Sequence, residues 1–409
     1  MERTDIDLVP VLLGGDLNSY NVARAFHEKY GVPTHVFGRY PIGPTMNSKI
    51  VVFHTVPKMD NDEIMTAELR NFAEKHENTA LILLGCTDDY AAMIIRNKGK
   101  LEDKYICPYI DEPLMDKLVS KAVFYEMCEK YDIPYPKTKI FTSDYKKEDL
   151  SEASLGFSYP IIIKPSSSIA YWKHPFDGMK KVYTASCAEE ADSIISQIYG
   201  AGYPDKMIIQ DMIPGDDSNM YVLTAYSDKD GKVKMMCLGH VLLEEHTPKG
   251  LGNHAAIITE YKPELTERFR KMLDDIGYKG FSNFDIKYDS RDGSLRAFEI
   301  NLRQGRSNFY ITSSGINIAE LLVDDYILNR RLEYTEQKHE HLWHTIPFGV
   351  VKKYVHNKPL LEKAKKLKKD GESGTSLLYA YDLLRSPKRL IWVAEHLRRQ
   401  YGKYKKYCK

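Results

Sequence analysis

The sequence has few cysteines and no long apolar segment. Its six cysteines form neither a Cys-x-x-Cys pair nor a zinc-ligand spacing. This excludes a disulfide-stapled scaffold and predicts reduced thiols in the cytosol. No run of about 18 apolar residues occurs, so we expect no transmembrane helix. The N-terminal stretch MERTDIDLVPVLL is too acidic and too short for a signal peptide, and these absences together predict a cytoplasmic protein.

The sequence also lacks the two commonest nucleotide-binding motifs. It contains no GxxxxGK[ST] phosphate loop, and no dinucleotide fingerprint follows the first predicted strand. The nearest match, GLGNHA (250–255), follows HTPK rather than a strand and fails the context that the motif requires. Any nucleotide must therefore be held by another kind of site.

The composition is that of an ordinary globular protein, but its charge is unevenly distributed. Hydrophobic residues make up 43% and charged residues 28% of 409 residues, enough for two or three domains. The net charge of +1 hides a basic C-terminal part, 352–409, with 17 Lys and Arg against 5 Asp and Glu. This part is either a solvated helical surface on an acidic body, which we favour, or a contact for nucleic acid or an anionic membrane.

The N-terminal third alternates short apolar strands with helical patterns, which predicts a parallel, Rossmann-like sheet. The expected strands are LVPVLLGG (8–15), THVFG (34–38), KIVVFH (49–54) and TALILLGC (79–86), and the expected helices are 19–31 and 61–76.

The middle of the chain is typical of antiparallel strands with helices. After a predicted helix within 115–138, the segments YPIIIKPSSS (159–168) and KMIIQDMIPGDD (206–217) are strands that end in small residues and in a Pro-Gly break. Segments 220–228 and 232–245 predict a hairpin across Asp-Gly. From about 331 the chain becomes polar and helical.

A second predicted hairpin carries the most informative side chains. SNFDIKYD (282–289) and FEINLR (298–303) both alternate, and the Asp-Gly between them favours a tight turn. A turn near Asp292 sets Asp285 opposite Glu299, and two opposed carboxylates repel unless a cation lies between them. Asn301 adds a neutral oxygen, and oxygen ligands suit Mg²⁺. The sequence therefore predicts a magnesium site in preference to a solvated face, provided that the register holds.

Four features in chain order resemble the ATP-grasp superfamily over about residues 8–325. They are Lys117 at the opening of a predicted helix, Lys164 at the end of an apolar strand, the IIQDMIPGDD break, and the DxK…ExNxR hairpin. The resemblance implies an ATP-grasp fold of mixed α/β and α+β class. Its expected domains are a Rossmann-like pre-ATP-grasp domain (1–114), an ATP-grasp domain with the ATP and magnesium sites (115–330), and a basic, mainly helical extension (331–409).

The resemblance also implies roles for individual residues. Lys117 and Lys164 correspond to the lysines that contact the ATP phosphates, and Lys164 and Arg303 would stabilise charge on the transferred phosphoryl group. Asp285, Glu299 and Asn301 correspond to the metal ligands for Mg²⁺, with Mn²⁺ as an alternative. The remaining nucleotide contacts are Ser166, Ser167 and Ser168 over the triphosphate, Gln210, Asp211, Met212 and Ile213 at the adenine hinge, and Asp217 at the ribose. Gln210 departs from the Glu common at its position, which leaves the role of its side chain open.

Two longer segments are similar to the D-aspartate ligase branch of carboxylate–amine ligases, namely 164–183 and INLRQGRSNFYITSSGIN (300–317). The branch implies ATP-dependent activation of D-aspartate or a similar acid and its coupling to a peptidoglycan-precursor amine. It thus implies small-molecule substrates, no specific nucleic acid, and an oligomeric state of which a homodimer is one option. An ATP-grasp ligase making a dipeptide or another amide, and a non-catalytic ATP- or polyanion-binding protein, remain alternatives.

Three residues of the second segment are candidates for substrate binding besides Arg303. A guanidinium pairs bidentately with carboxylates, so Arg306, with Ser307 and Asn308, is a candidate grip for a substrate carboxylate. A surface arginine near a helix start is the alternative.

The basic C-terminal part also shows apolar residues at helical spacing. Such a stripe usually docks on the protein's own body and leaves a cationic outer surface. The stripe comprises Leu383, Leu384, Leu390, Ile391, Val393, Ala394 and Leu397.

Overall fold

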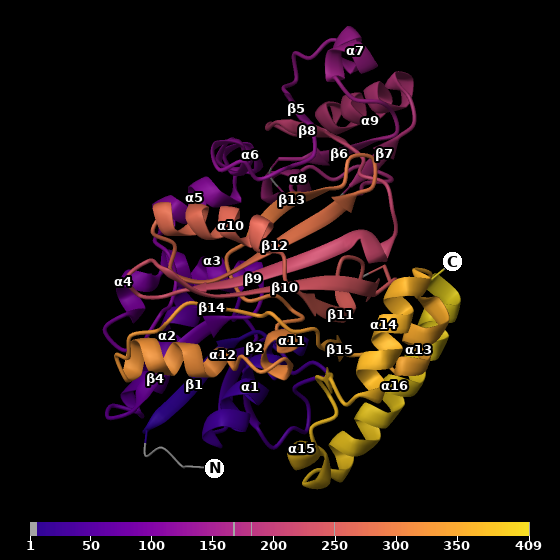
Figure 1. Ribbon diagram of the computed structural model, residues 1–409. Coiled ribbons are helices and arrows are strands. Elements are labelled where there is room, and N and C mark those ends of the chain that lie inside the picture. Colours follow the sequence, from indigo (N-terminus) through magenta and orange to yellow (C-terminus); the bar gives the residue numbers. More distant parts are fainter. Residues whose placement is uncertain (1–5, 167, 181, 249, 409) are drawn as a thin grey trace. The chain divides into compact units, whose positions relative to one another are not determined.

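The computed structural model describes residues 6–166, 168–180, 182–248 and 250–408 (Figure 1). The chain forms two compact units, each assembled from separate segments. Unit 1 comprises Met1–Asp116, Asp216–Ile286 and Ile300–Lys409, and unit 2 comprises Lys117–Gly215 and Lys287–Glu299. The division into three domains expected from the sequence stays a prediction.

The N-terminal part of unit 1 is the parallel sheet that the sequence predicts. The strand order is β3-β2-β1-β4, with Val11 beside His35 and Leu8 beside Ala80. Apolar side chains such as Val11 and Leu12 are fully buried, as expected when helices cover a parallel sheet. The strands are β1 (Leu8–Leu13), β2 (Thr34–Gly38), β3 (Val51–Thr55) and β4 (Ala80–Gly85), and the helices are α1 (Leu17–Tyr30), α2 (Asp62–Glu74), α3 (Asp88–Arg96) and α4 (Lys98–Leu101).

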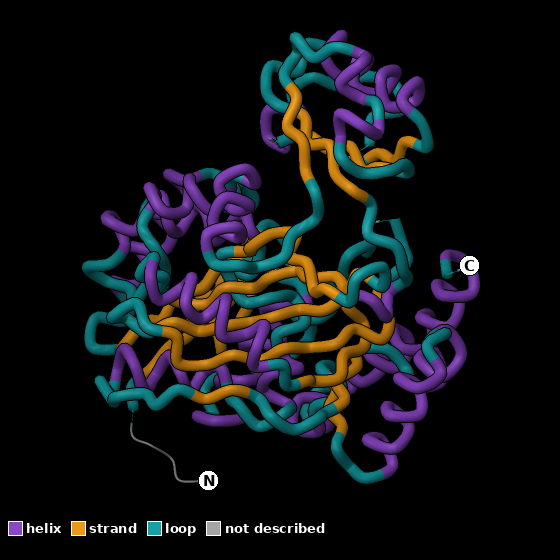
Figure 2. Tube along the Cα trace, turned by 45° about the horizontal axis from the view of Figure 1, so that its top comes forward, coloured by secondary structure: helices purple, strands orange, loops and turns teal. Residues whose placement is uncertain are grey.

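A larger sheet has the order β13-β12-β9-β10-β11-β15-β16, with β14 beside β10. Figure 2 shows its long strands in orange. The antiparallel pair β9–β10 confirms the predicted hairpin, because Ser227 lies beside Val233 across the turn. The strands are β9 (Met220–Ser227), β10 (Val233–Glu244), β11 (His254–Glu260), β12 (Gly280–Asp289), β13 (Ser294–Asn301), β14 (Thr335–Glu336), β15 (Leu342–His344) and β16 (Ser373–Thr375). The helices between them are η2 (Asp217–Asn219), α10 (Pro263–Asp275), α11 (Phe309–Ser313), α12 (Ile318–Leu322) and η3 (Val323–Ile327).

Unit 2 contains a small antiparallel sheet of order β5-β8-β6-β7, which confirms the antiparallel character predicted for the middle of the chain. Buried apolar residues such as Ile161, Ile163 and Ile195 form its core. Its strands are β5 (Thr138–Phe141), β6 (Ile161–Pro165), β7 (Tyr183–Ala185) and β8 (Met207–Asp211), and its helices are α6 (Lys121–Lys130), η1 (Lys147–Leu150), α7 (Glu152–Leu155), α8 (Ser168–Trp172) and α9 (Ala188–Gly200). The single helix expected within 115–138 is instead two, because α5 (Glu112–Val119) ends before Ser120 and α6 begins after it.

The C-terminal part of unit 1 differs from the sequence expectation in two respects. The segment after 331 is not purely helical, because β15 and β16 extend the larger sheet. The predicted apolar stripe is also only partly buried: Val393 is 1% exposed, whereas Leu384, Leu390 and Ile391 are 81%, 49% and 70% exposed. The last helices are α13 (Phe348–Tyr354), α14 (Lys358–Lys369), α15 (Ala380–Leu384) and α16 (Pro387–Tyr407).

Polar contacts as well as apolar ones dock α16 on the rest of unit 1. The Arg389 guanidinium lies 2.5 Å from the Asp382 carboxylate, and both side chains are fully buried. Asp382 also accepts hydrogen bonds from the Tyr20 hydroxyl at 3.0 Å and the Ser48 hydroxyl at 2.8 Å. Hydrogen bonds to other groups offset part of the cost of burying such a pair. This arrangement therefore fixes the start of α16 against α1 and the loop before β3.

Candidate active site

The turn that follows β13 in unit 1 carries the predicted arginines. Its shape depends on Gly305, because a Cβ there would lie 2.5 Å from Asn283 Oδ1. That oxygen accepts a hydrogen bond of 2.9 Å from the Thr224 hydroxyl. A side chain at Gly305 would have to displace a buried hydrogen-bonded amide, so the close approach requires glycine.

Two buried asparagines of α1 hold the same turn. Asn18 Nδ2 donates to the Gln304 carbonyl at 3.1 Å and to the Cys86 carbonyl at 2.9 Å, and Asn21 Nδ2 donates to the Arg306 carbonyl at 3.0 Å. The amides of Gln304 and Asn308 donate back to Asn18 Oδ1 at 3.1 and 2.8 Å. Buried amides linked in this way rigidify the backbone that they join. The start of α1 and the turn after β13 therefore form one support within unit 1.

Acidic side chains accompany both arginines. Arg306 lies 2.8 Å from the Glu245 carboxylate and 3.6 Å from that of Asp16. Arg303 lies 2.9 Å from the Asp88 carboxylate, and its second amino group donates to the other Asp88 oxygen at 3.0 Å. This part of unit 1 is therefore a cluster of mixed charge rather than a purely cationic one.

Burial and charge act against each other in this cluster. Burial raises the pKa of the Asp16 carboxyl, and Arg306 and Arg303 only partly offset that rise. Burial lowers the pKa of Arg303, but the negative charges of Asp88, Asp285 and Asp16 outweigh it and leave the pKa raised. Arg303 consequently stays cationic at every accessible pH.

Two of the three predicted metal ligands belong to unit 1 and contact each other. Asn301 Nδ2 donates to Asp285 Oδ2 at 3.3 Å. Glu299 stands two residues before Asn301 on β13 but belongs to unit 2, where its carboxylate accepts a hydrogen bond from Lys121. The described residues contain no group of three or more His, Cys, Asp or Glu that could hold a metal. The side chains predicted to bind the metal offer only carboxylate and amide oxygens, whose chemistry suits Mg²⁺ rather than a softer metal.

In unit 2, Lys164 and Gln210 are joined directly. Lys164 Nζ donates to Gln210 Oε1 at 3.0 Å, from the end of β6. Gln210 is buried, and its amide nitrogen donates to the Tyr125 hydroxyl at 2.8 Å and to the Thr138 hydroxyl at 2.9 Å. The glutamine thus accepts from a lysine while also donating to two hydroxyls, which a glutamate at the same position could not do.

The other residues predicted at the adenine hinge differ in their burial and in their bonding partners. The Asp211 carboxylate is 4% exposed and lies 2.5 Å from Arg291, so its side chain supports the tip of the β12–β13 hairpin. Lys287 Nζ donates to the Ile213 carbonyl at 3.0 Å, and Met212 is half-buried.

The first lysine of the predicted set does not open a helix as expected. Lys117 is exposed and lies in the last turn of α5. Lys121 opens α6 instead and binds Glu299. The sequence offered two lysines four residues apart, and the position of the helix break at Ser120 could not be read from it.

The predicted phosphate-covering loop is described in part. The Ser166 hydroxyl lies 3.3 Å from the Tyr203 hydroxyl; Ser167 lies outside the described residues, and Ser168 is the first residue of α8. Asp217, predicted at the ribose, begins η2 in unit 1. Its carboxylate accepts from the Glu244 amide at 2.8 Å and lies 2.7 Å from His246 Nε2.

Ser307 and Asn308 are buried next to Arg306. The amide nitrogen of Asn308 donates hydrogen bonds to Asn18 Oδ1 and to the Gly305 carbonyl, both at 2.8 Å. Asn308 therefore supports the turn, whereas the side-chain partners of Arg306 lie outside the turn.

The structure adds acidic residues that sequence reasoning missed, namely Asp16, Asp88 and Glu245. Asp16 had a signal, since it follows two glycines at the end of a predicted strand and caps α1 by accepting from the Asn18 amide at 3.0 Å. Asp88 and Glu245 are each one of several acids in their segments, and only the fold pairs them with the arginines.

A curated relative decides the family. D-aspartate ligase from Enterococcus faecium (strain Aus0004) is 38% identical over 409 residues, which cover 98% of this chain and 97% of that protein. The chain belongs to the D-aspartate ligase family. No protein-family model matches the chain.

Solved structures show that this chain has the ATP-grasp fold. N5-carboxyaminoimidazole synthetase from Staphylococcus aureus, complexed with ADP, superposes with a TM-score of 0.58 at 14% identity, over 84% of this chain and 83% of that one. L-amino acid ligase from Bacillus licheniformis gives 0.53 at 14% identity, over 79% and 75%.

These findings confirm the predicted fold, superfamily and reaction class. The protein is an ATP-dependent ligase that joins a carboxylate to an amine, so the non-catalytic alternative is wrong. No helix among the described residues is both long and apolar enough to cross a membrane.

Proposed function

We propose that the enzyme uses ATP to activate the β-carboxylate of D-aspartate and joins it to an amine of a peptidoglycan precursor in the cytoplasm. Its membership of the D-aspartate ligase family supports the donor and the acceptor class. We further propose that the sequence-predicted residues Lys117, Lys164, Ser166, Gln210 to Ile213 and Asp217 bind ATP.

The observation that carries the donor assignment is the mixed charge around Arg306. An amino acid used as a carboxylate donor brings a second carboxylate and an ammonium group. Arg306 suits the carboxylate that does not react, because guanidinium pairs with carboxylates bidentately. Asp16 and Glu245, which flank Arg306 at 3.6 and 2.8 Å, suit the ammonium group. A plain dicarboxylic acid would leave these two acids without a cationic substrate partner.

The proposed reaction has two steps. A β-carboxylate oxygen attacks the γ-phosphorus of ATP, the bond to ADP breaks, and an acyl phosphate forms. The amine then attacks the acyl carbon, loses a proton, and releases phosphate as the amide forms. Positioning and neutralisation of negative charge account for most catalysis of phosphoryl transfer. Arg303 and Lys164 would supply positive charge to the transferred group, and Asp88 would orient Arg303.

Asp285, Glu299 and Asn301 would hold Mg²⁺. When bound, Mg²⁺ neutralises phosphate charge and orients the γ-phosphorus for attack. Asn301 contributes its amide oxygen, while its nitrogen already donates to Asp285 and so fixes which end of the amide is available.

Hydroxylamine trapping tests this proposal without the natural acceptor. Hydroxylamine converts an acyl phosphate to a hydroxamate, whose formation can be compared between D-aspartate, L-aspartate, succinate and D-asparagine. We expect D-aspartate to give the highest rate. Succinate, which lacks the ammonium group, should be at least about a hundredfold poorer, because Asp16 and Glu245 then gain no cationic partner from the substrate while Arg306 turns to the substrate carboxylate. D-asparagine, which lacks the β-carboxylate, should give none. Equal rates with succinate and D-aspartate would contradict the role of the two acids.

A further inference from the structure

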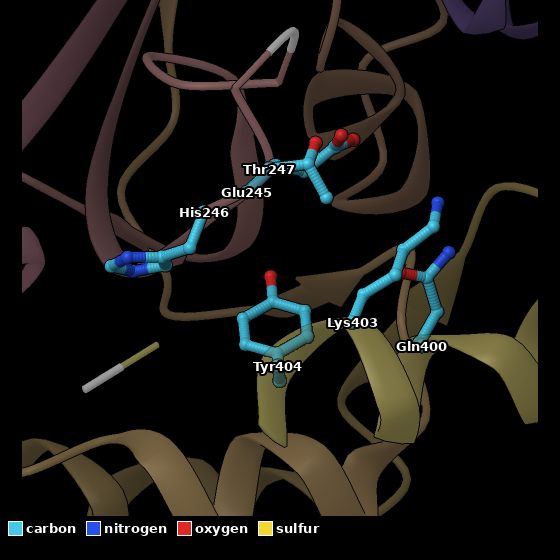
Figure 3. Close-up of a pocket in the computed structure, with 6 residues that line it drawn as sticks. All are labelled: Glu245, His246, Thr247, Gln400, Lys403 and Tyr404. Atoms are coloured by element: carbon cyan, nitrogen blue, oxygen red, sulfur yellow. The ribbon is translucent and has the colours of Figure 1, made fainter. Parts of the chain in front are cut away.

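A small pocket lies between the segment after β10 and the C-terminal helix α16, both within unit 1. It is lined by Glu245, His246, Thr247, Gln400, Lys403 and Tyr404 (Figure 3). Figure 3 shows the last three side chains rising from α16 on the side where the first three lie. The C-terminal extension therefore forms one wall of this pocket.

Both walls are fixed by hydrogen bonds. The Tyr404 hydroxyl donates to the Glu244 carbonyl at 2.6 Å. On the opposite wall, the Glu245 amide donates to the Asn253 carbonyl at 2.8 Å, and His246 is held by Asp217 at 2.7 Å. The pocket is thus a built part of unit 1 rather than a gap between loosely packed side chains.

The pocket shares a wall with the proposed donor site. Glu245 lines the pocket and also lies 2.8 Å from Arg306. Asp16 and Glu245 both lie beside Arg306, at 3.6 and 2.8 Å. The pocket therefore adjoins the proposed donor site through Glu245.

Lys403 is the cation of this pocket. Its side chain is half-buried, and within the described part of the chain it makes no hydrogen bond or ion pair. Burial, followed by the positive charges of Lys403 and Arg306, lowers the pKa of the neighbouring His396 to about 4, so the histidine is neutral at pH 7 and adds no charge of its own. By contrast Lys405, two residues further along α16, is exposed to solvent. Glu245, the acid that lines the same pocket, is engaged by Arg306 at 2.8 Å, so an anionic group that enters the pocket would find Lys403 as its ion-pair partner.

We infer that this pocket binds an anionic group of the amine acceptor, and that Lys403 of the C-terminal extension is the residue that recognises it. The inference rests on the proposed ligase function and extends it to the second substrate. An acceptor of this class is a peptide that carries both the attacking amine and a carboxylate. Lys403 acts as a specificity-determining residue: it takes no part in bond making, and places the acceptor beside the donor through Glu245 and Arg306.

The test compares Lys403→Gln with the matched control Lys405→Gln, which removes the same charge from an exposed position on the same helix. The probes are a short peptide with one lysine side-chain amine, used as its C-terminal carboxylate and as its C-terminal amide. Hydroxylamine serves as a third, uncharged acceptor. Amide formation and hydroxamate formation are measured with D-aspartate and saturating ATP.

We expect Lys403→Gln to raise the KM for the carboxylate peptide by about tenfold, the amount expected for loss of one partly buried ion pair. Relative to hydroxamate formation, coupling of the amide peptide should change little, and Lys405→Gln should leave all three acceptors unaffected. Equal KM values for the carboxylate peptide in the two variants would overturn the inference.

The remaining outcomes separate the inference from the function on which it rests. Wild-type enzyme that forms the hydroxamate but couples neither peptide also overturns the inference, while the donor assignment stands. Wild-type enzyme that forms no hydroxamate overturns the proposed function, and the pocket assignment with it.

Discussion

At the scale of single residues, Glu299 combines two properties on one carboxylate. It is a predicted metal ligand, and it pairs with Lys121 within unit 2. Glu299→Gln removes the charge but keeps the shape, so we expect ADP formation to be abolished while the protein stays folded. Glu126→Gln, on the exposed face of α6, is the control. ADP release and the melting temperature are the measurements, and wild-type turnover in Glu299→Gln would contradict the metal assignment.

Lys164 is the second residue whose substitution has a specific expected effect. Its Nζ is held at 3.0 Å by Gln210, which fixes the direction of the charge. Lys164→Ala should raise the KM for ATP by at least about tenfold, or remove activity, because one phosphate contact is lost. Lys139→Ala, an exposed lysine on β5 of the same sheet, is the matched control. Unchanged ATP kinetics in Lys164→Ala would show that Lys164 does not contact the nucleotide.

At the scale of elements, β15 carries a buried histidine with consequences for pH. His344 Nδ1 lies 2.7 Å from the Ile346 carbonyl and donates to it, and burial lowers the pKa of His344 to about 4. The unfolded chain takes up a proton near pH 6.5, whereas the folded chain resists protonation down to about pH 4. Stability is therefore complete above pH 6.5 and falls as the pH drops towards 4.

We expect His344 to lower the free energy of unfolding by roughly 2 kcal/mol when the pH falls from 7.5 to 5. Urea unfolding of wild type and of His344→Gln at both pH values measures it, with the exposed His356→Gln as control. The loss of stability on acidification should be smaller in His344→Gln by about that amount. An identical loss in wild type and His344→Gln would mean that another group is responsible.

The elements also show what local sequence could and could not predict. Strand 34–38 is confirmed residue for residue, and the β9–β10 hairpin is confirmed at its Asp-Gly turn, because both depend on apolar patterning and turn chemistry. The two-residue and three-residue strands β14 and β15 were missed, since segments so short carry no readable period.

In the candidate site too, local sequence predicted some contacts and could not predict others. Asp285 and Asn301 were placed on facing strands by alternation and the hairpin turn, and the structure brings them into contact. Glu245 and Asp88 could not have been paired with Arg306 and Arg303, because these contacts join segments 61 and 215 residues apart in the chain. Hydrophobic periodicity carries no information about which acid meets which arginine.

At the scale of the whole molecule, the basic C-terminal part belongs to the core of unit 1. Val355, Leu360 and Leu367 are buried in one cluster with strands β10 and β11, and Val393 in another with α1. Figure 1 shows α13, α14 and α16 side by side. Each such side chain stabilises the fold by about 1.5–3 kcal/mol, and a domain has only about 5–15 kcal/mol in all.

Removal of residues 352–409 should therefore unfold unit 1 rather than trim a surface. Far-UV circular dichroism and ANS binding of the truncated chain measure this, and a cut that removes only 405–409, after the buried Tyr404, is the control. A cooperative thermal transition retained in the long truncation would contradict the packing argument. Single charge changes such as those at Lys403 and Lys405 are for this reason the better probes of what the extension binds.

The assembly of unit 1 from three separate segments has a consequence for biosynthesis. Its first segment ends at Asp116, and its last begins at Ile300 and includes α16. A chain emerging from the ribosome exposes the apolar strands β1 to β4 and the buried asparagines of α1 well before the turn 304–308 and the helix α16 have been made. Unit 1 can therefore reach its final packing only after translation has passed α16, because α1 bonds to Asn308, which lies 290 residues beyond Asn18 in the chain.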